Sequence, residues 1–187
     1  MAVFRTLLPS EAWRYEAHLH RLDADDRRAR FMATLAGEAV SGHVRRIDWT
    51  RTVVAVAIVR GEVRAAAELR RDERHGGELA VSVERPWQNQ GLGTALTRRI
   101  LTAARNRRVR GLMMYCLPDN RRMQAIARKL MGPCVFDGGE VTSTVTLSAP
   151  NGLSLAQEAL DNSVVAFNAV LDQWQGGRRP DRPARAA

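Results

Sequence analysis

The stretch that decides the fold is ELAVSVERPWQNQGLGTAL, residues 78–96. Its first seven residues, 78–84, alternate in polarity as a β-strand does, and Pro86 ends the pattern because proline cannot donate to a strand ladder. An apolar stripe with helical spacing then follows, formed by Leu92, Leu96, Ile100 and Ala103. We therefore predict a strand over 78–84, a turn, and a helix over Gly91–Arg108.

The turn Gln88–Thr94 between this strand and this helix has the composition of an anion-binding loop. A helix N-terminus presents unpaired backbone N–H groups and a positive dipole end, which together bind phosphate. Gly91 and Gly93 lack the Cβ atoms that would obstruct a ligand. The pattern leaves open a P-loop, a dinucleotide fingerprint, a pyrophosphate of coenzyme A and a simple turn. A P-loop requires a lysine before Thr94, and a dinucleotide fingerprint requires glycine where Leu96 stands.

The residues before this stretch predict helices followed by a β-hairpin. We expect helices over Leu8–Leu22, capped by Ser10, and over Asp25–Leu35, where Asp23 and Asp25 cap the first turn. Residues 37–49 form a weaker helical or loop segment. The nearly continuous β-branched and alanine run 53–59 indicates a buried strand, which returns over 63–71.

The residues after this stretch continue the alternation of strands and helices. We expect a strand over 111–117, a helix opened by Asn120 and closed by Gly132-Pro133, and a hairpin joining 135–136 to 141–147. A last helix over Ser154–Trp174 covers the sheet or forms a dimer contact. The complete pattern predicts one α/β domain, a mixed sheet with helices on both faces. We assign 1–150 to that domain, 151–175 to the added helix, and 176–187 to a disordered Arg/Pro tail.

Composition excludes several classes of protein. The chain has 187 residues, enough for one domain, and no apolar run long enough to span a bilayer or to serve as a signal peptide, so we expect a cytoplasmic protein. Two cysteines and four scattered histidines predict neither a disulfide framework nor a metal site. The net charge of +9 fits a solvated basic surface and leaves open an anionic partner, namely a phosphorylated cofactor, nucleic acid or an acidic protein. The 5% aromatic content offers few stacking platforms and argues against nucleic acid.

Residues 78–132 resemble the core of the GNAT superfamily, the acyl-CoA-dependent N-acetyltransferases. The signature Gln/Arg-x-x-Gly-x-Gly/Ala stands here as Gln88, Gly91 and Gly93, followed by a basic helix, the strand LMMYC and Asn120. The segment RLDADDRRARFM, residues 21–32, is similar to the entry helices of GNAT domains in bacterial protein-lysine acetyltransferases. The resemblance implies a mostly antiparallel sheet with a splayed parallel strand pair, and acetyl-CoA as co-substrate without a metal.

The resemblance also implies which residues contact the cofactor. The backbone of Val81, Ser82 and Val83 corresponds to the strand that pairs with the pantetheine amides. Asn120 corresponds to an asparagine near the pantetheine, and Arg85, Arg98 or Arg99 could pair with the 3′-phosphate. The signature turn that would hold the pyrophosphate comprises Gln88, Asn89, Gln90, Gly91, Leu92, Gly93 and Thr94.

For catalysis, the resemblance points to Glu78 as the general base, with Glu84 and then Glu68 as weaker candidates. A backbone N–H near Val83 could stabilise the oxyanion. Many GNATs carry a tyrosine seven residues after the asparagine, where it protonates the departing sulfur. Ala127 stands there in this chain, so the acid is Tyr115, or water protonates the thiolate, or the protein binds CoA with little turnover.

The function implied is direct transfer of an acetyl group from acetyl-CoA to an amine in a ternary complex. The amine is a protein lysine, a protein N-terminus or a small molecule, and the entry helices favour a protein lysine. The alternative is a catalytically weak acyl-CoA-binding sensor, which the alanine at 127 favours; a nucleic-acid binder is a distant third. A homodimer is compatible with the apolar stripe of the last helix.

Overall fold

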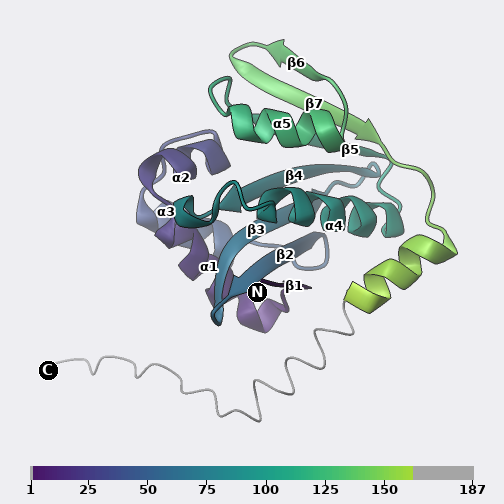
Figure 1. The fold of residues 1–187 in the computed structure, drawn as a ribbon, viewed down its shortest axis with the longest axis horizontal. Coiled ribbons are helices and arrows are strands. Elements are labelled where there is room, and N and C mark those ends of the chain that lie inside the picture. The colour runs from purple at the N-terminus through teal and green to yellow at the C-terminus, as the bar shows by residue number, and fades with distance from the viewer. Residues whose placement is uncertain (1, 162–187) are drawn as a thin grey trace, which may run out of the picture.

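A seven-stranded sheet forms the centre of the computed structural model, which describes residues 2–161 (Figure 1). The strands are β1 Val3–Thr6, β2 Thr52–Val59, β3 Glu62–Arg71, β4 Gly76–Val83, β5 Gly111–Cys116, β6 Cys134–Asp137 and β7 Glu140–Thr146. Their order in the sheet is β1-β2-β3-β4-β5-β7-β6. Every neighbouring pair is antiparallel except β4 and β5, which run parallel.

Helices cover both faces of this sheet, as the sequence predicted. They are α1 Ala12–Arg21, α2 Ala24–Phe31, α3 Gly37–Arg45, α4 Leu92–Asn106 and α5 Arg121–Leu130, with 3-10 turns at Pro9–Glu11 and Arg85–Trp87. Alternate residues of β2 enter separate cores, because neighbouring side chains of a strand point to opposite faces. Val53 and Ala55 pack with residues of α4 and α5, whereas Val54 and Val56 pack with residues of α1 and α3.

The parallel pair β4–β5 is joined over a short length only. Gly76, Gly77 and Glu78 are in register with Gly111, Leu112 and Met113. Beyond Glu78 the two strands have no further register partners in each other, although β4 runs on to Val83 and β5 to Cys116. The predicted mixed sheet with a splayed parallel pair is therefore confirmed, and the divergence leaves one edge of β4 uncovered by β5.

Two N-terminal details differ from the sequence prediction. Residues 3–6, for which no element was predicted, form β1 and pair with β2. Four residues are too few to show strand alternation in the sequence. Ser10 does not cap the first helix: the turn begins at Pro9, and the Glu11 carboxylate accepts the Leu8 N–H at 3.2 Å. Asp23 does cap α2, accepting the Asp26 N–H at 2.8 Å, as predicted.

The C-terminal helix is present over residues 152–161, where the described part of the chain ends. Its predicted continuation to Trp174, the apolar stripe beyond residue 161, and the tail 176–187 lie outside the described residues. Arg107 Nη1 donates to Glu158 at 2.5 Å, and Asn106 Nδ2 donates to the same carboxylate at 2.6 Å. These contacts connect the described part of this helix to the end of α4. Within residues 2–161 no helix has the length and hydropathy to cross a membrane.

A buried carboxylate ties three helices to β3. Glu68 Oε2 accepts hydrogen bonds from the Tyr15 hydroxyl of α1 at 2.7 Å and from Arg30 Nη2 of α2 at 2.7 Å. His43 Nε2 of α3 lies 2.9 Å from the same oxygen. Burial by itself would raise the pKa of Glu68, but the contacts with His43, Arg30 and Tyr15 outweigh it and lower the pKa to about 2.

This cluster makes stability depend on pH. Because the folded pKa of Glu68 lies below the ordinary value of 4.5, its contribution is complete above that value and is lost as pH falls towards about 2. We expect Glu68→Gln to lower the free energy of unfolding at neutral pH by about 3–5 kcal/mol, since Arg30 then lacks its counter-charge. We also expect the variant to lose less stability than the wild type on acidification, measured by urea unfolding at several pH values. Glu140→Gln, at an exposed position on β7, serves as control; equal acid sensitivity of wild type and Glu68→Gln would contradict the assignment.

Candidate functional site

A cavity of about 720 Å³ lies beside the second half of β4. Its walls come from β4, from α2, from the turn before α4, and from the start of α5. Of the eleven residues predicted to contact a cofactor, ten line this cavity: Val81, Ser82, Val83, Gln88, Asn89, Gly91, Leu92, Gly93, Thr94 and Asn120. Gln90 does not; its exposed side-chain amide donates to the carbonyl of Pro86 at 3.0 Å. Segments separated in sequence thus converge on one hollow.

The open edge of β4 faces away from β3. The Glu84 N–H donates to the Arg64 carbonyl of β3 at 3.0 Å, and bonding directions alternate along an antiparallel strand. The backbone N–H and C=O groups of Ser82 therefore point at β3. Those of Val81 and Val83 point to the opposite side of β4, along the edge that β5 does not cover. On this side the Val83 carbonyl accepts Gln88 Nε2 at 3.0 Å, and the register directs the Val83 N–H to the same side. This register favours Val81 and Val83, and not Ser82, for the predicted backbone contacts.

The two signature glycines serve different purposes. Gly91 is the N-cap of α4 with φ +80°, a left-handed conformation that side chains rarely adopt, and open space surrounds the position of a Cβ. A Cβ on Gly93 would lie 3.1 Å from Ile126 Cδ1 of α5 and 3.6 Å from Val83 Cγ2. Gly91 thus shapes the turn, and Gly93 lets the first turn of α4 pack closely against β4 and α5.

The start of α5 closes the other side of the cavity. Asn120 is its N-cap, and Oδ1 accepts the Met123 N–H at 3.1 Å. The side-chain oxygen of Asn120 therefore holds the helix end in place beside the cavity. Ala127, at the position of the family's tyrosine, is 1% exposed and belongs to the core under the sheet.

Charged side chains of α2 and α5 line the rim of the cavity. Arg85 Nε lies 2.6 Å from Asp23 Oδ2 and 3.6 Å from Asp26 Oδ2, so this predicted phosphate partner already has carboxylate partners. Arg122 of α5 and Asp26 of α2 are 3.8 Å apart, and Arg28 of α2 reaches Asp119 before α5 at 3.5 Å. The last two pairs connect α2 with the α5 side of the cavity.

The other two predicted phosphate partners lie elsewhere. Arg98 is exposed on α4 and does not line the cavity. Arg99 pairs with Asp161 of the C-terminal helix and lies over the Phe4 ring at 5.1 Å, on the β1 side of the molecule. The geometry favours neither as a ligand of a phosphate bound in this cavity.

The two predicted catalytic residues lie next to the divergence of β4 and β5 but outside the cavity wall. Glu78 is in register with Met113 at the last paired position, its side chain is 40% exposed, and it accepts Arg70 Nη2 at 2.6 Å. The Tyr115 hydroxyl lies 3.5 Å from Met113 Sδ. Because in-register neighbours and alternate residues share a face, Glu78, Met113 and Tyr115 lie on one face of the sheet.

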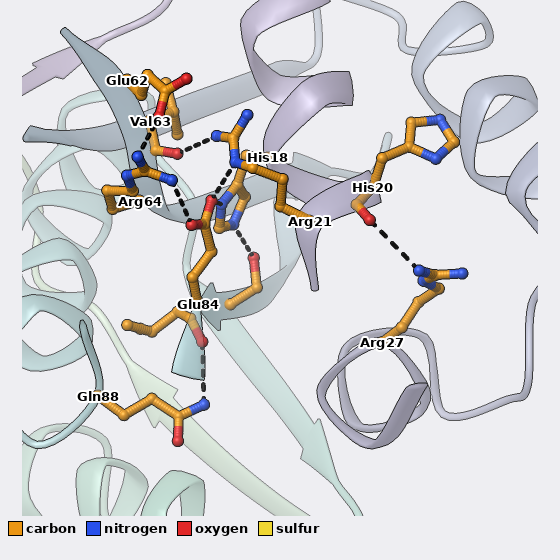
Figure 2. A network of polar contacts seen from close by, with 11 residues as sticks. His18, His20, Arg21, Arg27, Glu62, Val63, Arg64, Glu84 and Gln88 are labelled. Atoms are coloured by element: carbon orange, nitrogen blue, oxygen red, sulfur yellow. Dashed lines mark hydrogen bonds and ion pairs between the residues drawn. The ribbon is translucent and has the colours of Figure 1, made fainter. Parts of the chain in front are cut away.

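Sequence reasoning missed a buried chain of polar groups beside β4 (Figure 2). Ser82 Oγ lies 2.9 Å from His18 Nε2, and His18 Nδ1 lies 3.1 Å from Glu84 Oε1. Glu84 also accepts Arg21 Nε at 2.9 Å and Arg64 Nη1 at 2.8 Å. His18 belongs to α1 and lies 64 residues before Ser82 in the sequence, so no local motif predicts this contact.

The pKa values of this chain of groups argue against Glu84 as a neutral-pH base. Burial would raise its pKa, but the hydrogen bonds from His18, Arg64 and Arg21 lower the pKa of Glu84 to about 2. A general base works best with a pKa near the operating pH, which neither Glu84 nor Glu68 approaches. Burial lowers the pKa of His18, more than the nearby Glu84 raises it, so this imidazole is neutral at pH 7. Within the described residues no group of three or more His, Cys, Asp or Glu side chains could hold a metal ion.

Comparison with known proteins matches this geometry to one family. The sequence profile of the "Acetyltransferase (GNAT) family" matches residues 5–132, well over half of the chain, whereas no curated protein matches significantly. Among solved structures, the GNAT domain of S. lividans PAT aligns with a TM-score of 0.64 at 21% identity, over 77% of this chain and 89% of that one.

Two further structures share the fold. The ribosomal-protein-S18-alanine N-acetyltransferase from Escherichia coli aligns with a TM-score of 0.59 at 16% identity, over 81% of this chain and 97% of that one. A mutant of the cAMP-binding acyltransferase from Mycobacterium smegmatis aligns with a TM-score of 0.58 at 21% identity, over 90% of this chain and 52% of that one. At these identities the likeness shows a common fold.

Proposed function

Because the chain belongs to the acetyltransferase (GNAT) family, an acyltransferase family that uses acyl-CoA, we propose that it moves an acetyl group from acetyl-CoA to an amine by direct transfer in a ternary complex. The observation that carries the proposal is the open edge of β4, which shares one cavity with the glycine turn before α4. A ligand with backbone-like amides at one end and a pyrophosphate at the other fits that combination. Acyl-CoA donors are intracellular, so we also propose a cytoplasmic location.

The cofactor is proposed to lie along the cavity in a single direction. The pantetheine amides pair with the backbone of Val81 and with the Val83 N–H, because these groups point away from β3 and the Val83 carbonyl is already bonded to Gln88. The pyrophosphate lies on residues 89–94, where the first N–H groups of α4 face the cavity. The thioester then lies where β4 and β5 diverge, close to the face that carries Glu78.

The chemistry requires a polarised thioester carbonyl, a neutral amine and a proton for the departing thiolate. We propose that a backbone N–H on the open edge of β4, beside the thioester, stabilises the oxyanion and that Glu78 removes the proton of the amine, directly or through water. Ala127 has no acidic group, and the Tyr115 hydroxyl lies against Met113 Sδ at 3.5 Å, so water is proposed to protonate the thiolate. The reaction leaves the acceptor as an amide and releases CoA.

The acceptor is proposed to approach from the face of the sheet that carries Glu78 and Tyr115, opposite the α4 face. The partly exposed carboxylate of Glu78 makes this face suitable for an amine, either a protein lysine or a small molecule. The E. coli neighbour is named for acetylating the alanine of a ribosomal protein, and a protein acceptor agrees with that precedent. The alternative is an acyl-CoA sensor with little turnover, which Ala127 favours because no side-chain acid replaces the family's tyrosine.

The first test addresses the pyrophosphate site with a matched pair of glycines. Gly91 and Gly61 both have φ +80° with open space around the Cβ position, but only Gly91 lines the cavity. We expect Gly91→Glu to weaken acetyl-CoA binding at least about 100-fold, because it places a negative charge at the pyrophosphate. Gly61→Glu carries a similar backbone strain and charge in the β2–β3 turn and should bind as the wild type does, measured by isothermal calorimetry.

Equal affinity of Gly91→Glu and wild type would contradict the site assignment. Loss of binding in both variants would attribute the effect to backbone strain and would likewise remove the support for this site.

The second test addresses the base. We expect Glu78→Gln to lower kcat for amine acetylation by about 100-fold or more while the affinity for acetyl-CoA stays within about threefold, because general base catalysis contributes on that scale. Glu140→Gln, on β7, is the control and should leave both quantities unchanged. The measurement is steady-state release of CoA with a panel of amines and lysine peptides, alongside calorimetry. An unaltered kcat in Glu78→Gln would exclude Glu78 as the base.

A further inference from the structure

The N-terminal helices leave one face of the β5–β7–β6 half of the sheet open. The described apolar core under α1 and α3 draws its strand residues from β2 and β3, and α5 packs on the other face of β5 with Leu112 and Met114. Strand register and alternation place five side chains on the open face, which Glu78 of β4 borders. We call these residues the bare face: Met113 and Tyr115 of β5, Thr142 and Thr144 of β7, and Val135 of β6.

The bare face is accessible and wider than a small amine requires. Val135 is 61% exposed and Tyr115 is 36% exposed, and Thr144 is exposed as well. Neighbouring strands lie about 4.8 Å apart, so the surface extends about 14 Å from β4 to β6. That width matches about four residues of extended polypeptide at about 3.3 Å each. A small amine at Glu78 would leave most of this surface unused.

The charge of this region differs in sign from that of the whole molecule. Strands β5, β6 and β7 contain no lysine or arginine, although the chain has 29 of them. The charged residues of these strands are the carboxylates Asp137 and Glu140, and Glu78 adds a partly exposed carboxylate at the β4 border. The net charge of +9 repels a cationic partner from the molecule as a whole, whereas these strands present it with no like charge. Charge therefore favours a basic segment on the bare face.

Tyr115 adds a contact that suits a cation. It lies two residues beyond Met113, the last residue of β5 in register with β4, so it borders the point at which the two strands diverge. The face of an exposed aromatic ring attracts an ammonium or guanidinium group. An amine that reaches Glu78 across the bare face therefore meets this ring beside the divergence.

We propose that the acceptor is a lysine in a basic polypeptide segment, which docks across the bare face from β6 to β4 and presents its amine to Glu78. This inference rests on the proposed function, and it goes further by choosing a polypeptide over a small molecule and by naming the surface that selects it. The transfer itself is unchanged. The neutral lysine nitrogen bonds to the acetyl carbon, its proton goes to Glu78, the C–S bond breaks, and water protonates the thiolate.

The first experiment compares two peptides that differ only in charge. Each has one central lysine, flanked by two arginines in one peptide and by two glutamates in the other. With the full chain and acetyl-CoA, we expect kcat/KM to be at least about tenfold higher for the arginine peptide at about 50 mM salt. The ratio should fall at about 500 mM salt, because ions screen the charges. Propylamine, a small amine, should be a poorer acceptor than the arginine peptide and should depend little on salt.

Two neighbouring residues of β6 supply a matched pair of variants. Val135 belongs to the bare face, whereas Phe136 points to the opposite face and is 66% exposed. We expect Val135→Lys to raise KM for the arginine peptide about fivefold to tenfold, because the added charge repels the peptide. Phe136→Lys adds the same charge to the same strand and should leave KM within about twofold. Calorimetry with acetyl-CoA checks that both variants are folded.

Peptide binding is also measured without turnover, by fluorescence anisotropy of the labelled arginine peptide with and without CoA. Binding that Val135→Lys weakens and Phe136→Lys does not, in the absence of any acetylation, would support the bare face and reject the proposed chemistry. Acetylation of propylamine but of neither peptide, or equal kcat/KM for the two peptides, would overturn the bare face and leave the acetyltransferase standing. Equal effects of the two variants on KM, or no binding of the arginine peptide, would also overturn it. A dimer that Val135→Lys dissociates in analytical ultracentrifugation would assign this surface to a second copy of the chain and reject the peptide.

Discussion

The structure depends on the divergence of two parallel strands. β4 and β5 are in register over three residues and then separate, and β4 continues for five residues with its outer edge uncovered by β5. An uncovered edge exposes N–H and C=O groups that must find partners, which natural sheets usually prevent. Here the glycine turn, α2 and α5 surround that edge, so it becomes one wall of a cavity and remains closed to another sheet. The cavity, the proposed cofactor and the proposed chemistry all follow from this one separation.

The local parts of this arrangement could be predicted from sequence. The run 78–96 shows its strand, its turn and its helix because each is specified by neighbours: alternation, Pro86, and an apolar stripe after Gly91. The resemblance to GNAT proteins added the parallel pair, which periodicity cannot specify. The pairing register of β3 and β4 could not be predicted from sequence. It decides that the backbone groups of Val81 and Val83 face the open edge and that those of Ser82 face β3. The contact of His18 with Ser82 spans 64 residues and requires the packing of α1, which no pattern along the chain records.

Some of the arginines have a structural role inside the folded protein. Composition alone relates the 29 basic residues to solubility or to an anionic partner. The structure uses several of them internally: Arg30 is buried against Glu68, while Arg21 and Arg64 meet on Glu84. Their planar, multiply donating groups hold both carboxylates ionised in places where burial would otherwise favour protonation. Part of the arginine content therefore belongs to internal ion pairs, and the number of basic residues overstates how many are available to partners.

The short seam between β4 and β5 has a mechanical consequence. The strands β5, β6 and β7 form one antiparallel group, and β1 to β4 form another. Three parallel residue pairs join them within the sheet, and a shared apolar core with α4 and α5 and the ion pairs between α2 and the α5 side join them across it. Fewer residues are paired across this seam than between any other two neighbouring strands of the described sheet, so we expect the two groups to separate here before either one unfolds. A molecule bound across both groups opposes that separation, by a free energy that grows with the logarithm of its concentration relative to its Kd. Occupancy of the cavity and resistance of the seam to opening are therefore thermodynamically linked.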